Sequence, residues 1–153
     1  MKIRKVESGD IDGIKSVLDS IDLFPSEMLD DMISDYFDNP ESQDIWYCAV
    51  EAGNVIALGY CAPEKLTEGT YNLYAIGVRS DIQSTGIGSK MMNYIEEYLG
   101  QIGGRVLIVD TSGTDDFAQT RKFYEKLNYI KEAVIRDFWS EGDDKIVYWK
   151  RID

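Results

Sequence analysis

A junction between a strand-like run and a helix-like run is the feature that most constrains the fold of this chain. Residues 71–78 are largely apolar and typical of a strand. In residues 87–102, apolar side chains recur every three or four positions, as on one face of a helix. Gly86 and Gly88 stand where one run passes into the other. Such a junction brings free backbone N–H groups to the positive end of a helix dipole, which suits a phosphate group.

Four interpretations of this junction compete. A dinucleotide-binding loop, G-x-G-x-x-G, needs a third glycine where Met91 stands, and no acidic residue ends a following strand about twenty residues on. An ATPase-type loop, G-x-x-x-x-G-K-[ST], lacks both its first glycine and the hydroxyl residue after Lys90. The other two are a short pyrophosphate-binding turn at residues 83–88 and an ordinary turn with glycines for close packing. The local sequence leaves these two open.

The apolar patterns along the chain predict a mixed α/β domain with helices on both sides of a sheet. Gly53-Asn54 is a hairpin signal. With 153 residues and neither repeat nor linker, residues 1–153 fit a single domain. We expect helices at residues 11–21, 25–37, 87–102 and 116–127, and strands at residues 2–6, 44–51, 55–62, 71–79, 106–111, 129–138 and 145–152.

Net charge argues against two classes of partner. The formal charge is −12, which opposes binding to nucleic acid and to anionic membrane surfaces. The same charge would attract a cationic substrate such as an amine, although acidity more often serves solubility. No run of about 18 apolar residues could span a membrane. The N-terminus does not resemble a signal peptide, so we expect a cytoplasmic protein.

Two residue types limit the chemistry of the chain. Cys48 and Cys61 lie in apolar strand-like runs, which predicts two buried free thiols in a reducing compartment. The chain has no histidine, which excludes histidine-based triads, histidine metal sites and histidine general bases. We expect no metal. Proton transfer must therefore use Asp, Glu, Tyr, Cys, Lys or water.

The sequence around the junction resembles motif A of the GNAT family of N-acetyltransferases, whose signature is [QR]-x-x-G-x-[GA]. Residues 83–88, Gln-Ser-Thr-Gly-Ile-Gly, fit this signature in full, and residues 73–78 resemble the family's fourth strand. Residues 122–129, Lys-Phe-Tyr-Glu-Lys-Leu-Asn-Tyr, are similar to the family's FYEKLGF helix end. The order of elements matches over essentially the whole chain. The resemblance implies an α+β fold with a mixed, mostly antiparallel sheet of about seven strands.

The resemblance also implies acetyl-CoA as the co-substrate. Backbone N–H groups of residues 84–89 would hold its pyrophosphate, and Ile76 and Val78 would pair with its pantetheine arm. In the family this strand bulges and diverges from its neighbour, and an N–H near Val78 would polarise the thioester carbonyl. The implied cofactor-binding residues are Ile76, Gly77, Val78, Gln83, Ser84, Thr85, Gly86, Ile87, Gly88, Ser89 and Tyr124.

Catalysis would then depend on Tyr124, which matches the family tyrosine that protonates the departing CoA thiolate. A phenol is a suitable donor because a thiolate needs only a weak acid near neutral pH; the alternative is that Tyr124 packs as core with Phe123. The general base is open, because the matching strand offers no carboxylate. Asp110 is the best single candidate, and a water relay is equally compatible. The acids considered are Glu64, Glu68, Asp110 and Asp137.

Two positions depart from the family pattern. Phe117 replaces an asparagine that contacts pantetheine in the family, and Asn128 stands where the family has glycine. Neither change puts the fold in doubt. The polar side chains that could contact pantetheine in place of that asparagine are Thr111, Ser112, Thr114 and Asp115.

We therefore expect an enzyme that moves an acetyl group from acetyl-CoA to a primary amine of an unidentified acceptor. The alternative is a non-catalytic acyl-CoA sensor on the same fold; a dehydrogenase-like nucleotide domain would need the glycine that Met91 replaces. The acceptor could be a small molecule or a peptide. Its pocket could include Phe24, Trp46 and the aromatic residues of 136–139. Dimers are common in the family, although no residue here demonstrates a homodimer.

Overall fold

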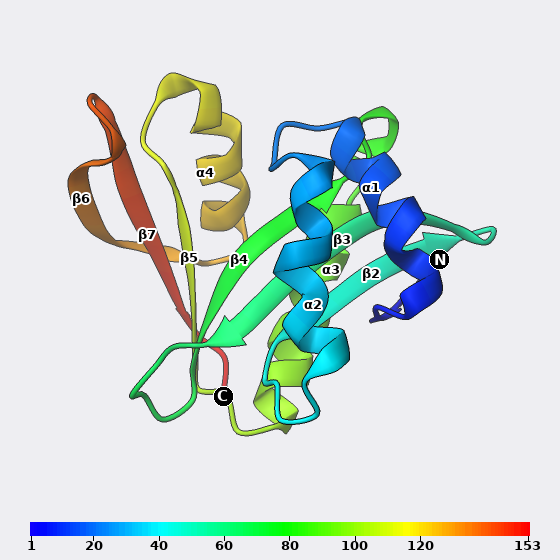
Figure 1. The fold of residues 1–153 in the computed structure, drawn as a ribbon. Coiled ribbons are helices and arrows are strands. Elements are labelled where there is room, and N and C mark those ends of the chain that lie inside the picture. Colours follow the sequence, from blue (N-terminus) through cyan, green and yellow to red (C-terminus); the bar gives the residue numbers. More distant parts are fainter. The chain divides into compact units, whose positions relative to one another are not determined.

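The computed structural model describes residues 1–153 and contains seven strands and four α-helices (Figure 1). The strands are ordered β1-β2-β3-β4-β5-β7-β6, and β4 pairs with β5 in parallel while the ladders β1–β2, β2–β3, β5–β7 and β6–β7 are antiparallel. This confirms the expected α/β class with a mostly antiparallel seven-stranded sheet. In chain order the elements are β1 (Lys2–Lys5), α1 (Ile11–Asp19), α2 (Leu29–Asp38), β2 (Ile45–Glu51), β3 (Asn54–Pro63), β4 (Thr70–Val78), α3 (Ile87–Gln101), β5 (Val106–Ser112), α4 (Ala118–Lys126), β6 (Ile130–Ser140) and β7 (Asp143–Arg151).

The chain forms two compact units, and each is described by itself. Unit 1 contains Met1–Pro63 and Tyr74–Glu96, and unit 2 contains Glu64–Leu73 and Glu97–Asp153. The strand β4 and the helix α3 each begin in one unit and end in the other.

In unit 1, helices lie on both faces of the β2–β3 ladder. Successive strand residues point to opposite faces, so Trp46 and Tyr47 pack against different helices. Trp46 belongs to the buried cluster formed with α1 and α2, whereas the Tyr47 ring stacks on Tyr94 of α3 at 5.5 Å. Figure 1 shows α1 and α2 side by side in front of these strands, with α3 behind them.

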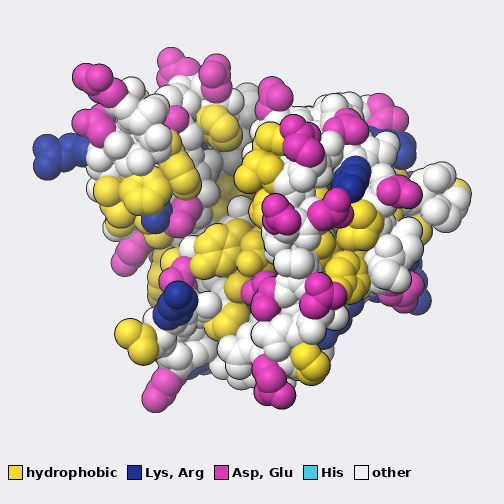
Figure 2. Space-filling model, viewed as in Figure 1, with side chains coloured by type: hydrophobic (Ala, Val, Ile, Leu, Met, Phe, Trp, Pro, Cys, Tyr) yellow, Lys and Arg dark blue, Asp and Glu magenta, His cyan; other side chains and the backbone are white.

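The cores of α1 and α2 follow from the spacing of their apolar residues. In α1, Ile14, Val17 and Leu18 fall on one face and are buried, and in α2 Leu29 and Ile33 do the same one turn apart. Each such side chain stabilises the fold by about 1.5–3 kcal/mol when fully buried. The outer faces are acidic, and Figure 2 shows carboxylates spread over both helices.

Gly59 in β3 leaves the space that the Tyr47 ring occupies. The two residues are cross-strand neighbours, and a Cβ atom on Gly59 would lie 2.2 Å from Cζ of the buried Tyr47. A rigid ring held between a sheet and a helix has little room to move.

We expect Gly59→Ala to lower the free energy of unfolding by about 3 kcal/mol, at the upper end of overpacking costs. Chemical denaturation followed by circular dichroism would measure it. Gly9→Ala is the control, because a Cβ there meets nothing within 4 Å. Equal stability of Gly59→Ala and the wild type would contradict this packing.

A partly buried ion pair ties β1 to the start of α1. The Arg4 guanidinium donates two hydrogen bonds to the Asp10 carboxylate, at 2.7 and 3.0 Å, and the Glu7 N–H donates a third at 2.7 Å. Hydrogen bonding from Arg4 is the main reason that the pKa of Asp10 lies below its usual value. Burial beside this pair raises the pKa of the Cys48 thiol to about 11.

The lowered pKa of Asp10 gives a stability contribution that depends on pH. It is fully present above the unfolded-state value of about 3.9 and is lost as pH falls through the lower folded-state value. At pH 7, Asp10→Asn should cost about 1.5–3 kcal/mol, as for hydrogen bonds to charged groups. Urea titrations should show this difference shrinking from pH 4 downward. Asp12→Asn removes an exposed carboxylate nearby and serves as the control; a pH-independent difference would refute the role of Asp10.

Unit 2 contains β5, α4 and the β6–β7 hairpin. Tyr124 of α4 packs edge-on against Phe123 and Tyr129 and tilted against Tyr148 of β7, with ring centroids 5.2–5.8 Å apart. The strand β6 is exposed along its whole length. Its Asp137 has φ +54 and its carboxylate accepts a hydrogen bond from the Gly142 N–H, which shapes the turn.

Three local predictions were wrong. The first hairpin turns at Ala52-Gly53, because Glu51 pairs with Asn54 and both turn residues take positive φ. The last hairpin likewise turns at residues 141–142, so its strands extend beyond the expected ends at residues 138 and 145. Ile102 lies beyond the end of α3 and is 49% exposed rather than buried. Register and helix ends depend on cross-strand and capping contacts, which apolar spacing does not reveal.

Candidate acyl-CoA site

The strand β4 contains a one-residue bulge between Tyr74 and Gly77. Leu58 and Tyr60 are two residues apart in β3 and point to the same face. A Cβ on Gly77 would meet Leu58 at 3.6 Å, and the Tyr74 ring contacts that of Tyr60. Residues three apart in a regular strand point to opposite faces, so β4 must carry an extra residue between these two. Such a bulge matches what the family resemblance implies for this strand.

Gly77 is buried because the segment after α1 packs directly on it. A Cβ there would lie 2.5 Å from Cδ1 of Ile21 and 3.2 Å from Cδ2 of Leu23. A larger residue would push this segment away from β4. Ile76 and Val78, on either side, are half-buried.

Side-chain hydrogen bonds hold the turn that follows β4 in shape. The Gln83 side-chain amide donates to the Val78 carbonyl oxygen at 3.0 Å, and the Thr85 hydroxyl donates to the Ile82 carbonyl oxygen at 2.6 Å. The Ser80 N–H donates to the Ser20 hydroxyl at 3.2 Å. Gln83, the first residue of the predicted signature, therefore fastens the turn to the end of the strand.

The turn has backbone N–H groups that lie before the first helical hydrogen bond of α3. Ser84 and Gly86 take φ values of +63 and +88, and residues 83–86 are exposed. The first helical bond of α3 runs from the Lys90 N–H to the Gly86 carbonyl oxygen, so the N–H groups of residues 87–89 precede the helical ladder. Left-handed turn residues followed by a helix N-terminus form a concave site for anions. The structure thus brings all predicted residues from 83 to 89 together at one end of α3.

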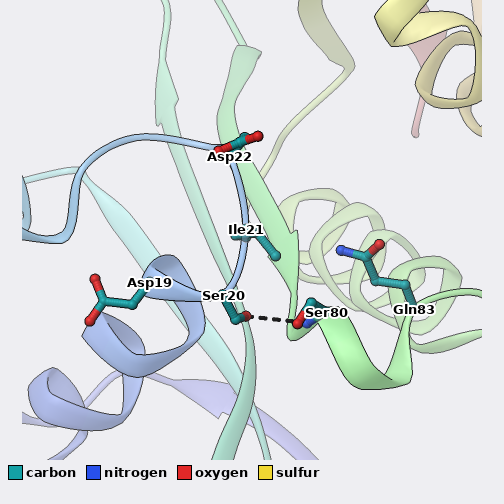
Figure 3. A pocket seen from close by; sticks show the side chains of 6 residues that line it. All are labelled: Asp19, Ser20, Ile21, Asp22, Ser80 and Gln83. Atoms are coloured by element: carbon teal, nitrogen blue, oxygen red, sulfur yellow. Dashed lines mark hydrogen bonds between the residues drawn. The ribbon is translucent and has the colours of Figure 1, made fainter.

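A polar cavity of about 320 Å³ adjoins this turn in unit 1 (Figure 3). It is lined by Asp19, Ser20, Ile21, Asp22, Ser80 and Gln83. Figure 3 shows the carboxyl group of Asp19 turned away from Ser80 and Gln83.

In unit 2, Tyr124 lies in an apolar setting. Its side chain is 4% exposed, and burial raises the pKa of its phenol well above the usual value. The hydroxyl therefore stays protonated across the physiological range and can act as a hydrogen-bond or proton donor.

Asp110 in β5 belongs to a polar network within unit 2. Its Oδ2 atom lies 3.2 Å from Lys145 Nζ and accepts a hydrogen bond from Asn72 at 3.4 Å. The Asn72 amide also donates to Glu64 at 2.8 Å, while Asp110 Oδ1 is buried without a partner. Lys145 and Asn72 therefore both contact the same carboxylate oxygen of Asp110. No pattern in the sequence indicated this pairing.

A protein-family model for the acetyltransferase (GNAT) family matches residues 15–129. The chain belongs to the GNAT family. No curated protein has a significantly matching sequence.

Solved structures support the GNAT fold over the full chain. A GNAT-family protein from Desulfovibrio desulfuricans is 28% identical, with a TM-score of 0.92 and 99% of both chains covered. The ribosomal-protein-S18-alanine N-acetyltransferase from Escherichia coli is 16% identical, with a TM-score of 0.80 over 99% of this chain and 94% of that one. An aminoglycoside 6'-N-acetyltransferase complexed with coenzyme A is 20% identical, with a TM-score of 0.78 over 100% and 98%.

The two departures from the GNAT pattern have different local explanations. Asn128 takes φ +70 directly after α4, a conformation that asparagine tolerates better than most residues and that explains why it replaces glycine. Phe117 lies at the start of α4 and is 39% exposed, with no contact that explains the substitution.

Of the other acids considered as general base, Asp137 shapes the last turn, and the Glu68 carbonyl accepts a hydrogen bond from Arg105.

No helix of this GNAT chain is both long and apolar enough to cross a membrane.

Proposed function

We propose that the protein is an N-acetyltransferase that transfers an acetyl group from acetyl-CoA to a primary amine. The observation that carries this proposal is the exposed turn at residues 83–89, whose left-handed residues and free N–H groups precede α3. A pyrophosphate carries the charge and oxygen acceptors that such a turn binds. Family membership and the coenzyme A complex of a structural neighbour support the same donor.

Acetyl-CoA would be held along β4 and its turn. Residues 84–89 would bind the pyrophosphate through backbone N–H groups, with Gln83 keeping the turn closed. The backbone of Ile76, Gly77 and Val78, directly after the bulge, would pair with the pantetheine arm as an added strand does. A bulge disrupts regular pairing, which leaves backbone groups for a ligand.

The reaction would proceed by direct attack. The neutral amine nitrogen forms a bond to the thioester carbonyl carbon while the N–H near Val78 stabilises the developing oxyanion. The carbon–sulfur bond then breaks, the nitrogen loses a proton, and Tyr124 donates a proton to the leaving thiolate. Because burial raises the pKa of Tyr124, its hydroxyl keeps its proton at neutral pH until the thiolate forms. Solvent would return its proton.

Removal of the amine proton would use Asp110 or a water relay. Asp110 Oδ2 already contacts the Lys145 ammonium and accepts a hydrogen bond from the Asn72 amide. We therefore favour water that passes the proton to bulk solvent.

The same ion pair keeps a second function open, that of a non-catalytic acyl-CoA sensor. A sensor would bind acetyl-CoA at the turn but would need no base. Incubation with acetyl-CoA and a panel of primary amines, read as free thiol, separates the two functions. Amine-dependent thiol release supports the transferase. Binding of acetyl-CoA by calorimetry without thiol release across the panel supports the sensor.

A further inference from the structure

Three aromatic rings form a row in unit 1, on the face of the sheet that α1 and α2 cover. Trp46 of β2 stacks on its cross-strand neighbour Tyr60 of β3, with centroids 4.3 Å apart and planes at 7°. Tyr60 contacts Tyr74 of β4 at 5.4 Å. Trp46 is fully buried, Tyr60 is half-buried and Tyr74 is 51% exposed. The row therefore runs from the core to the surface and presents its last ring to solvent.

A half-buried carboxylate lies beside the middle ring. Asp44 lies close enough to Tyr60 for each side chain to shift the pKa of the other. The Asp44 N–H donates to the Ser42 hydroxyl, and this hydroxyl donates to Asp35 at 2.6 Å, so the turn after α2 holds the backbone of Asp44.

The charge of Asp44 has no basic partner. The charged residue that acts on it is Asp35, another acid, and burial together with Asp35 raises the pKa of Asp44. Burial and the nearby Asp44 raise the pKa of Tyr60 to about 12. Figure 2 shows hydrophobic side chains exposed over β4 next to carboxylates over α2. A cation bound here would gain both a carboxylate and aromatic faces.

The amine that is acetylated cannot be this cation, because the attacking nitrogen must be uncharged. A second nitrogen in the same acceptor can stay protonated throughout the reaction. Tyr74 lies four residues before Val78 on β4, which is at most about 13 Å at the usual rise of a strand, because the bulge between them shortens the span. A flexible chain with a nitrogen at each end can span a distance of this order.

We propose that Tyr74, Tyr60 and Asp44 bind a second, non-reacting ammonium group of the acceptor, so that diamines and polyamines are the preferred acceptor class. The inference rests on the proposed function, since it names the acceptor of that reaction.

The test compares α,ω-diamines of four, six and eight carbons with monoamines of the same chain length. Thiol release with acetyl-CoA gives kcat/KM for each, halved for diamines because they carry two equivalent amines. The wild type should prefer the best diamine at least tenfold over its monoamine. Asp44→Asn, which removes the charge and keeps the size of the side chain, should reduce this ratio toward one through KM, and Tyr74→Leu should lower it as well. Asp12→Asn removes an equal charge from exposed surface and should keep the ratio.

Calorimetry with 1,8-diaminooctane in the absence of acetyl-CoA separates this inference from the proposed function. Diamine binding that Asp44→Asn weakens, without turnover of any amine, would support the ammonium site and refute the transferase. Turnover with equal kcat/KM for diamine and monoamine would support the transferase and overturn the ammonium site. A wild-type preference that both Asp44→Asn and Tyr74→Leu retain would also overturn it.

Discussion

Tyr124→Phe should lower kcat for amine acetylation by about 10²–10⁴-fold, the range lost when a general acid is removed. The substitution deletes only the hydroxyl and keeps the ring that packs against Phe123, Tyr129 and Tyr148. The fold and the affinity for acetyl-CoA should therefore be nearly unchanged. Single-turnover kinetics with free thiol as the readout, together with calorimetric titration of acetyl-CoA, would measure both.

Tyr148→Phe is the matched control. Its ring lies 5.7 Å from that of Tyr124, and its hydroxyl donates to Glu125 at 3.1 Å rather than toward a reacting group. We expect its rate to stay within a few-fold of the wild type. A fully active Tyr124→Phe enzyme would remove Tyr124 from the mechanism and favour protonation of the thiolate by water.

The pH profile gives an independent view of Tyr124. A phenol acts as an acid only while protonated, so activity that depends on it is lost as pH rises through its pKa. Because burial raises this pKa above the ordinary value of about 10, the wild-type kcat should not fall between pH 8 and pH 10. A decline in kcat within that window, absent from Tyr124→Phe, would show that the phenol ionises lower than its burial implies.

Gly86→Ala should weaken acetyl-CoA binding by about 10–100-fold, which corresponds to the removal of one or two hydrogen bonds to a charged group. Gly86 has φ +88, where a Cβ is strained, although no neighbouring atom lies within 4 Å of that Cβ. Alanine would therefore act through the backbone and turn the N–H groups of residues 84–89 away from a common point. Calorimetric titration with coenzyme A, which carries the pyrophosphate but no acetyl group, isolates this contact.

Gly142→Ala is the control that separates a loss of coenzyme A binding from the backbone strain of alanine at positive φ. Gly142 also has positive φ, +81, with nothing within 4 Å of a Cβ, but it lies in the β6–β7 turn. Both alanine variants should lose a similar amount of stability, about 1–2 kcal/mol. Only Gly86→Ala should lose affinity for coenzyme A; equal affinities in the two variants would mean that the turn at residues 83–89 does not bind the pyrophosphate.

The local sequence was sufficient to predict structural features that depend only on a few consecutive residues. Gly86 and Gly88 at the start of a helical pattern predicted the turn, since left-handed φ and a helix N-terminus are properties of a few consecutive residues. The seven-stranded fold also followed from short-range apolar patterns, supported by the GNAT resemblance. Asn128 could keep the left-handed end of α4 without glycine for the same local reason.

Tertiary structure alone decided which side chains share an environment. The bulge between Tyr74 and Gly77 is defined by the facing residues Tyr60 and Leu58, and a strand pattern of period two cannot indicate an extra residue without its partner strand. The pairing of Asp110 with Lys145 and of Asp44 with Tyr60 joins residues far apart in sequence. The sequence by itself therefore determined the glycine turn at residues 83–89, whereas the setting of each carboxylate depended on folding, because burial and pairing arise only when distant strands meet.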